Sequence, residues 1–160
     1  ADLRQSSVAA YFGLDPRQLG LTEVIGGQAE LDRVISQSDV PNLSLLTSGI
    51  EPPNPAEILG SRRMNGLVKG LREKYDFVLI DSPPVLAVSD TLMISQHVDS
   101  VILVARSQKT LKKSANEASQ RLRRVNARLA GVVLNDFQDP DLYRVSGSYY
   151  YVENPKAANG

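Results

Sequence analysis

The sequence predicts an α/β fold with a mainly parallel sheet, and two observations support this prediction. Four short apolar runs are separated by stretches with helical character, which is the alternation typical of α/β layered domains. Three of these runs consist almost entirely of Val, Ile, Leu or Phe, without regular alternation of apolar and polar residues. Such continuous hydrophobicity predicts strands buried on both faces, as parallel strands covered by helices are.

The four apolar runs are the predicted strands, and short helices are expected before and between them. The strands are Leu43–Thr47, Phe77–Ile80, Val101–Ala105 and Gly131–Leu134. The short helices are expected over Val8–Leu14, Leu31–Ser36 and Ser89–His97, with a loop at Gly26 and Gly27 between the first two.

A long helix is predicted over Pro55–Lys74, because three start signals coincide there. Asn54 has the character of an N-cap, Pro55 stands at the first helical position, and Glu57 lies three residues after the cap. These residues indicate that the chain turns sharply into the helix after the first predicted strand.

A second long helix is predicted over Lys109–Arg128, where apolar residues recur at steps of three and four. Its opposite face is basic and carries Lys112, Lys113, Arg121, Arg123, Arg124 and Arg128. A phosphate-binding face is one interpretation of these charges. A solvated helix surface is the commoner meaning of such a pattern, and we favour it.

Composition limits the class of protein. The chain has 160 residues, which suits one domain, and 18 basic residues balance 18 acidic ones. This balance argues against nucleic acid as a partner. The absence of cysteine excludes disulfides and thiolate metal sites and favours a cytoplasmic location. No apolar run reaches the ~18 residues that a membrane-spanning helix needs, so we expect any membrane attachment to come from another segment.

Asp81 is the first candidate for chemistry, because it follows the apolar run Phe77–Ile80 directly. Ligands of open α/β sheets collect at the carboxyl ends of the strands. An aspartate in this position resembles a Walker B residue, which holds Mg2+ in nucleotide hydrolases and kinases. The alternative is that Asp81 only caps the following turn, and the strand alone does not decide between these roles.

A succession of motifs resembles one family. Asp2 and Arg4 match the end of a Walker A-prime strand, and Tyr11–Leu14 follows. Leu45–Gly49, then Pro52–Leu59, the Asp81 strand and Val85–Asp90 come in the order and spacing found in bacterial tyrosine autokinases of the polysaccharide-export type. The resemblance runs from Asp2 to about Asn135. It implies a P-loop NTPase-like three-layer sandwich that uses ATP and Mg2+.

The same resemblance implies roles for three residues. Asp2 would bind Mg2+ and help to deprotonate a tyrosine hydroxyl, and Asp81 would hold the water shell of the metal. Asn135, at the end of the last predicted strand, would contact adenine. Its alternative role is that of a turn residue with a side-chain hydrogen bond.

The end of the chain is tyrosine-rich, and we predict from the sequence a kinase domain over 1–137 and a flexible tail over 138–160. The resemblance implies that the tail is phosphorylated in a neighbouring subunit, at residues drawn from Tyr143, Tyr149, Tyr150 and Tyr151. The alternative is an aromatic tail that packs on the core or on a partner. Each phosphate would add about −1.5 to −2 charges, enough to drive subunits apart.

The sequence departs from the family pattern at its beginning. It contains no glycine-rich phosphate loop of the form G-x-x-x-x-G-K-[ST], and Gly26–Gly27 is too short to replace it. We therefore expect a domain that is incomplete at its N-terminus and inactive by itself, with the phosphate-loop strand of the family missing beside Phe77–Ile80.

The resemblance also implies partners and a location. The complete protein would form a homo-oligomer, act with a membrane chain-length or co-polymerase adaptor, and be reversed by a tyrosine phosphatase. It would lie in the cytoplasm at the inner face of the bacterial plasma membrane, held there by an upstream or partner membrane domain. The family's role is in exopolysaccharide or capsule synthesis and export.

Two classes of alternative stay open. A partition- or septum-site-type ATPase shares the deviant Walker arrangement but does not need the tyrosine tail. A non-catalytic regulatory or interaction domain is the other alternative. A phosphoryl-accepting receiver is disfavoured, because no acidic pair precedes Asp81 and the hydroxyl residues Thr47 and Ser48 come before it rather than after it.

Overall fold

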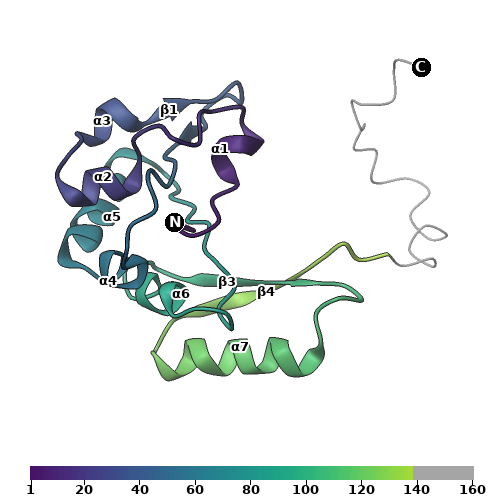
Figure 1. Cartoon of the computed structure of the whole chain (residues 1–160). Coiled ribbons are helices and arrows are strands. Elements are labelled where there is room, and N and C mark those ends of the chain that lie inside the picture. Colours follow the sequence, from purple (N-terminus) through teal and green to yellow (C-terminus); the bar gives the residue numbers. More distant parts are fainter. Residues whose placement is uncertain (139–160) are drawn as a thin grey trace, which may run out of the picture.

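The computed structural model describes residues 1–138, and the predicted tyrosine tail lies outside this range. The N-terminal half contains short elements: α1 Val8–Tyr11, α2 Leu21–Gly26, α3 Leu31–Val34, β1 Ser36–Gln37, β2 Ser44–Leu45 and α4 Pro55–Leu59. The second half contains longer ones: α5 Arg62–Lys74, α6 Asp90–Ile94, β3 Val101–Arg106, α7 Lys112–Arg124 and β4 Leu129–Asn135. Helices α1 to α5 form one lobe, β3, β4 and α7 form the other, and α6 lies between them (Figure 1).

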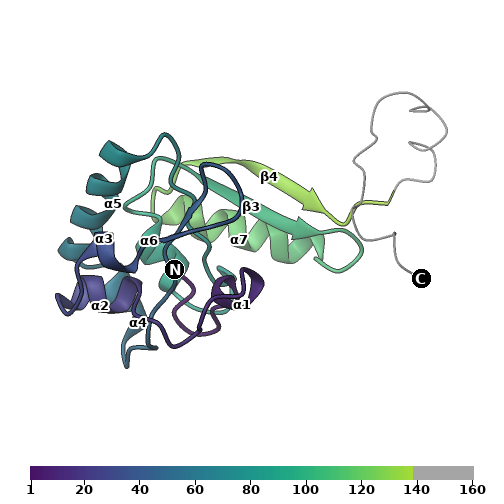
Figure 2. The ribbon, with the colours of Figure 1, turned by 90° about the horizontal axis from the view of Figure 1, so that it is seen from above.

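Strands β3 and β4 form the predicted parallel pair. Their register runs from Val101 opposite Leu129 to Arg106 opposite Asn135, with one irregularity after Val101. Helix α7 connects the two strands and covers one face of the pair (Figures 1 and 2). Ala118 and Leu122 of α7 are buried there. The α/β class is therefore confirmed, with the β3–α7–β4 unit as its clearest part.

The predicted strand Phe77–Ile80 is not a strand in the structure. This segment has no regular secondary structure, and Phe77 and Leu79 are 86% and 89% exposed. The apolar run showed only that the side chains of this segment are suited to burial. A strand also needs a neighbour that accepts and donates its ladder hydrogen bonds, and within residues 1–138 no segment pairs with this one.

Other boundaries also differ from the predictions. The run Leu43–Thr47 contributes only the two-residue strand β2, which pairs antiparallel with β1. The predicted helix 55–74 breaks into α4 and α5, because Ser61 caps a new helix by accepting the N–H of Met64 at 3.1 Å. Asn54 makes no cap hydrogen bond to the backbone and contacts Glu57 instead.

Helix α2 lies where the sequence predicts a loop. It begins after Gly20 and ends at Gly27, whose φ of 75° is the left-handed conformation that often terminates helices. The loop expected at Gly26 and Gly27 is thus the end of this helix.

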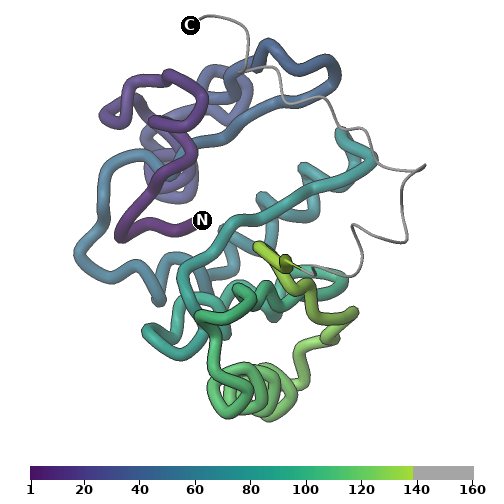
Figure 3. The backbone as a smooth tube through the Cα atoms, turned by 90° about the vertical axis from the view of Figure 1, so that its right-hand side faces the viewer, coloured from purple at the N-terminus to yellow at the C-terminus, as the bar shows by residue number. Residues whose placement is uncertain are grey.

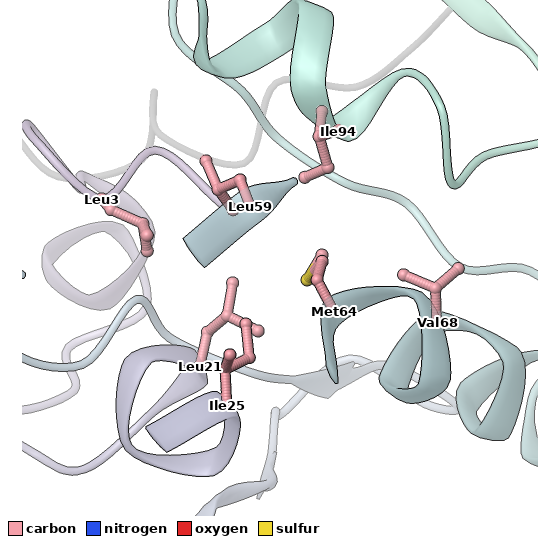
Figure 4. Close-up of a cluster of buried hydrophobic side chains, with 7 residues drawn as sticks. All are labelled: Leu3, Leu21, Ile25, Leu59, Met64, Val68 and Ile94. Atoms are coloured by element: carbon pink, nitrogen blue, oxygen red, sulfur yellow. The ribbon is translucent and has the colours of Figure 1, made fainter. Parts of the chain in front are cut away.

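Two separate apolar clusters stabilise the fold. The first, named here the N-terminal core, consists of Leu3, Leu21, Ile25, Leu59, Met64, Val68 and Ile94 (Figure 4). The second, the helix–sheet core, consists of Val85, Ala118, Leu122 and Ala127. The chain begins in the middle of the molecule, between the two lobes (Figure 3). Ala1 and Ile80 both pack against the N-terminal core, so the first residues lie near the segment that follows Ile80.

Candidate functional site

The first predicted site residue, Asp2, lies in a tight turn at the start of the chain. Its Oδ1 accepts the backbone N–H groups of Arg4 and Gln5 at 3.0 and 2.9 Å. Leu3, between them, is buried in the N-terminal core and anchors the turn. Two hydrogen bonds to one oxygen fix the carboxylate's orientation and leave Oδ2 with no hydrogen-bond partner among residues 1–138.

Asp81 lies close to the same place. It follows Ile80, which packs against the N-terminal core, while its own side chain is exposed. Burial lowers the pKa of the Ala1 amine, and the carboxylates of Asp81 and Asp2 oppose this shift by their charge. Both carboxylates therefore act on one cationic group. The structure brings the two acidic residues that the sequence singled out to a common point.

Two carboxylates around a cation suit Mg2+, which is commonly held by one or two carboxylates and keeps several of its waters. Among the described residues, no three acidic or histidine side chains are grouped so as to hold a metal ion by themselves. The remaining ligands of a metal here would be water and the nucleotide phosphates.

Arg4 turns away from Asp2 and pairs with Asp90. Its Nε and Nη2 donate to the two oxygens of Asp90 at 2.8 and 3.1 Å, and Asp90 is fully buried at the first position of α6. This hydrogen bond raises the pKa of the Arg4 guanidinium. The arrangement is a two-pronged ion pair, which is geometrically specific as well as attractive.

The neighbour of Asp90, Thr91, contacts the other acidic loop. Its Oγ1 donates to the carbonyl of Pro83 at 2.5 Å, and Thr91 is also buried. Sequence reasoning did not single out Asp90 or Thr91. A signal was present: two adjacent polar residues open a helix that is otherwise apolar, Leu92–Met93–Ile94.

Asn135 lies at the C-terminal end of β4, as predicted. Its Oδ1 accepts the N–H of Asp136 at 2.9 Å, and its backbone carbonyl accepts the N–H of Ser107 at 2.8 Å. Asp136 in turn pairs with Arg106 at 2.8 Å and has a φ of 57°. Asn135 thus makes the turn-type hydrogen bond considered above. A contact with adenine stays a prediction.

The other features are outside this site. Tyr143, Tyr149, Tyr150 and Tyr151 lie beyond the described residues. The basic residues of α7 are on its exposed side, apart from Arg121, which pairs with Glu117 at 2.8 Å. An open cavity of about 500 Å3 lies between α2 and α3, and it is lined by Gln18, Leu19, Gly27, Gln28, Ala29, Glu30, Arg33, Val34 and Ser36. None of the predicted site residues reaches it.

The fold and the two acidic loops define a class first. A family model described as an AAA domain matches residues 4–130, so the chain is a domain of that class. A tyrosine-protein kinase of Acinetobacter johnsonii is 41% identical to the chain over 138 residues, which are 86% of this chain and 19% of that protein. The chain belongs to the bacterial tyrosine kinases and comprises part of their catalytic domain.

Solved structures agree with this assignment. The kinase domain of VpsO is 36% identical, with a TM-score of 0.81, and the likeness covers 86% of this chain and 68% of that one. The kinase domain of the Escherichia coli tyrosine kinase ETK is 33% identical, with a TM-score of 0.82, over 94% of this chain and 57% of that one. The P-loop NTPase-like fold is thereby confirmed. The chain spans about a fifth of the length of three curated relatives.

A plasmid partition protein from Borrelia burgdorferi has the same fold at lower similarity. It is 21% identical, with a TM-score of 0.64, over 92% of this chain and 71% of that one. This likeness concerns the fold alone.

Proposed function

We propose that the protein carrying this chain is an ATP- and Mg2+-dependent tyrosine autokinase that regulates the synthesis and export of an exopolysaccharide or capsule. The observation that carries the proposal is that the carboxylates of Asp2 and Asp81 both lie near the backbone nitrogen of Ala1, in a chain that belongs to the bacterial tyrosine kinases. A bound Mg2+ would supply charge neutralisation at the transferring phosphoryl group.

Asp2 and Asp81 have different roles in this proposal. Asp81 is exposed at the end of its segment and would hold the water shell of the metal. Asp2 has one oxygen fixed by two backbone N–H groups, so the other oxygen can face the metal or a tyrosine hydroxyl. A phenol has a pKa of about 10 and needs a base nearby before it attacks. Asp2 is the candidate for that base, and Asn135 is the candidate for the adenine contact.

The substrate of the transfer would be the tyrosine-rich end of a second copy of the chain. In this proposal, residues 1–137 form the catalytic part of the chain, and 138–160 present Tyr143, Tyr149, Tyr150 and Tyr151. Such transfer requires a homo-oligomer in the complete protein. The added charge would weaken contacts between copies, and a tyrosine phosphatase would restore them.

A cytoplasmic position at the inner face of the membrane is part of the same proposal. No helix in the described part of the chain has the length and apolar character that a bilayer crossing needs. The attachment would come from a membrane adaptor of the chain-length or co-polymerase kind, in the same polypeptide or in a partner. We propose no nucleic acid as a partner, because 18 basic and 18 acidic residues balance over the chain.

The first prediction tests the acidic site. Asp81→Asn in the full-length protein should abolish autophosphorylation while leaving the fold intact, because it removes a negative charge beside the metal. Loss of such a metal-centred interaction costs several kcal/mol of transition-state stabilisation, so the rate should fall by about two orders of magnitude or more. Transfer of labelled phosphate from ATP measures the rate, and circular dichroism measures the fold.

Asp76→Asn is the matched control. Asp76 is also an exposed aspartate, at the other end of the segment 77–80, and we expect it to leave activity unchanged. Wild-type activity in Asp81→Asn, or equal losses in both variants, would contradict the assignment of Asp81.

The partition-type ATPase is the second candidate, because its deviant Walker arrangement resembles the Asp2 and Asp81 motifs of this chain. The two functions differ in the fate of the phosphate. An autokinase leaves acid-stable phosphate on tyrosine, whereas an ATPase releases all of it to water. Phosphoamino-acid analysis of the full-length protein after incubation with MgATP separates them.

A further inference from the structure

Two buried polar residues open α6, and the active-site roles proposed so far do not use them. Asp90 is fully buried and Thr91 is 6% exposed. An aspartate is seldom fully buried unless a partner satisfies its charge. Each of these two side chains has one long-range partner, and each partner lies on a different acidic loop.

Asp90 is connected to the Asp2 loop. Both its oxygens accept hydrogen bonds from the Arg4 guanidinium, at 2.8 and 3.1 Å. Arg4 is two residues after Asp2, and its own backbone N–H donates to Asp2 Oδ1 at 3.0 Å. A displacement of Asp90 would therefore move Arg4, and Arg4 would in turn move the Asp2 carboxylate.

Thr91 is connected to the Asp81 loop. Its hydroxyl donates to the carbonyl of Pro83 at 2.5 Å, and Pro83 is two residues after Asp81. Pro83 is itself buried, and as a proline it has no N–H, so its carbonyl is the polar group through which its backbone can be held. The loop around Asp81 has no strand ladder to hold it, which makes this contact more important.

We propose that Asp90 and Thr91 are positioning residues, which set the separation of the Asp2 and Asp81 carboxylates so that both can bind one Mg2+. The inference rests on the proposed function and adds the element that builds the site. One helical turn holds both loops, because Asp90 and Thr91 are consecutive residues on the rigid backbone of α6. Partners outside the ligand shell that orient metal ligands typically change metal affinity by about 10- to 100-fold when they are removed.

Stability alone does not account for this pair. Arg4 is 40% exposed, so only the Asp90 side of this ion pair is removed from solvent, and an apolar side chain could fill the same space in the core. Polar groups with fixed directions give a defined geometry instead. Here that geometry is given to the two loops that carry Asp2 and Asp81.

The test uses Thr91→Val, which keeps the shape of the side chain and removes the hydroxyl, together with Thr91→Ser, which restores it. Ser95→Ala is the matched control, because Ser95 is also buried and lies at the C-terminal end of α6. Its hydroxyl donates to the backbone carbonyl of Leu92 in the same helix, at 2.7 Å, and contacts neither acidic loop. Asp90→Asn, which keeps the shape and removes the charge, tests the other contact. All four variants are made in the full-length protein.

Two readouts are measured. The first is Mn2+ alone, titrated in the absence of nucleotide and followed by the electron paramagnetic resonance signal of the free ion. The second is the Mn2+ concentration that gives half-maximal autophosphorylation at saturating ATP, compared with the maximal rate. In Thr91→Val and Asp90→Asn, we expect the dissociation constant for Mn2+ and the Mn2+ concentration for half-maximal autophosphorylation each to rise about tenfold. In Thr91→Ser and Ser95→Ala, we expect both values to stay close to those of the wild type.

The outcomes separate the inference from the proposed function. Equal Mn2+ affinity in Thr91→Val and wild type, including no binding by either, overturns the positioning role. So does a loss of affinity that Thr91→Ser does not restore, or one that Ser95→Ala reproduces. A wild-type protein that binds Mn2+ but does not phosphorylate itself contradicts the kinase proposal, and the Mn2+ titration of the variants still decides the role of Asp90 and Thr91.

Discussion

At the scale of single residues, Glu23 shows how one buried carboxylate can hold two segments together. Glu23 is 3% exposed, and its Oε2 and Oε1 accept the N–H groups of Gly20 and Ile50 at 2.8 and 3.1 Å. Gly49 has a φ of 77°, and a Cβ there would lie 2.0 Å from Glu23 Oε2. Glycine at this position is therefore required both by the backbone conformation and by the closeness of the carboxylate.

The second prediction concerns this residue. Glu23→Gln should destabilise the protein by about 1–3 kcal/mol, because the amide can accept only with its oxygen and places N–H donors against a buried N–H. Equilibrium unfolding in urea measures the change. Glu73→Gln on the exposed side of α5 is the control and should stay within about 0.5 kcal/mol of wild type.

Equal stabilities of the two variants would show that the Glu23 contacts do not contribute to the fold. A larger loss in Glu73→Gln than in Glu23→Gln would have the same meaning.

Sequence reasoning found Asp2 and Asp81, which are partly buried and exposed, and missed the fully buried acidic residues. Asp2 and Asp81 belong to local motifs, so their neighbours in the sequence indicate their position. The partners of Glu23 and Asp90 include Ile50 and Arg4, which are 27 and 86 residues away along the chain. No local pattern reports such a contact, because it depends on how the elements pack.

At the scale of elements, the break between α4 and α5 follows from a competition between caps. Asn54 and Ser61 are both good N-cap residues, seven positions apart. Ser61 caps α5 through Met64, and α4 ends at Gly60. The change of direction lets Leu59 and Met64 both enter the N-terminal core (Figure 4). The sequence predicted the helical character of this stretch, but tertiary packing decided where it breaks.

The third prediction tests the cap. Ser61→Ala in the full-length protein should lower the free energy of unfolding by about 1 kcal/mol, because the N–H of Met64 loses its acceptor. Ser119→Ala, within α7, removes a hydroxyl where alanine is the better helix former and should be neutral or slightly stabilising. Thermal unfolding followed by circular dichroism measures both, and a Ser61→Ala protein as stable as wild type would show that this cap is not needed.

At the scale of the whole molecule, one face of the β3–β4 pair is open. Ile102 and Val104 are 59% and 62% exposed, and Val133, which lies opposite Val104, is about half exposed. Helix α7 covers the opposite face (Figure 2). The sequence predicted strands buried on both faces, and that holds for one face within the described residues. The apolar pattern reports the capacity for burial, whereas burial itself depends on a neighbouring element.

The fourth prediction concerns the tyrosines. Phosphate should appear on Tyr149, Tyr150 or Tyr151, with Tyr143 as a further candidate, when the full-length protein is incubated with MgATP. Exposure alone does not select a substrate, because Tyr11 is 84% exposed as well. Peptide mass spectrometry locates the phosphate. Replacing the four tail tyrosines by phenylalanine should remove it, whereas Tyr11→Phe should not, and phosphate found only on Tyr11 or Tyr75 would rule out the tail as substrate.

The last prediction is that the isolated chain 1–160 neither binds MgATP tightly nor phosphorylates itself, whereas the full-length protein does both. A triphosphate needs several backbone N–H donors and usually a lysine, and the sequence has no glycine-rich loop that supplies them. Asp2 and Asp81 repel the phosphates until Mg2+ bridges them.

The comparison of the isolated chain with the full-length protein also tests the exposed face of β3 and β4. The chain spans 68% and 57% of two solved kinase domains. The isolated chain should also associate through the exposed face of β3 and β4, because Ile102 and Val104 form part of an uncovered apolar surface there.

Calorimetry with MgATP, autophosphorylation and light scattering are measured on both proteins. Micromolar binding by the isolated chain would show that its own residues make a phosphate site. Binding and activity in the longer protein, together with neither in the isolated chain, would support the prediction, because the phosphate donors would then come from residues other than these 160.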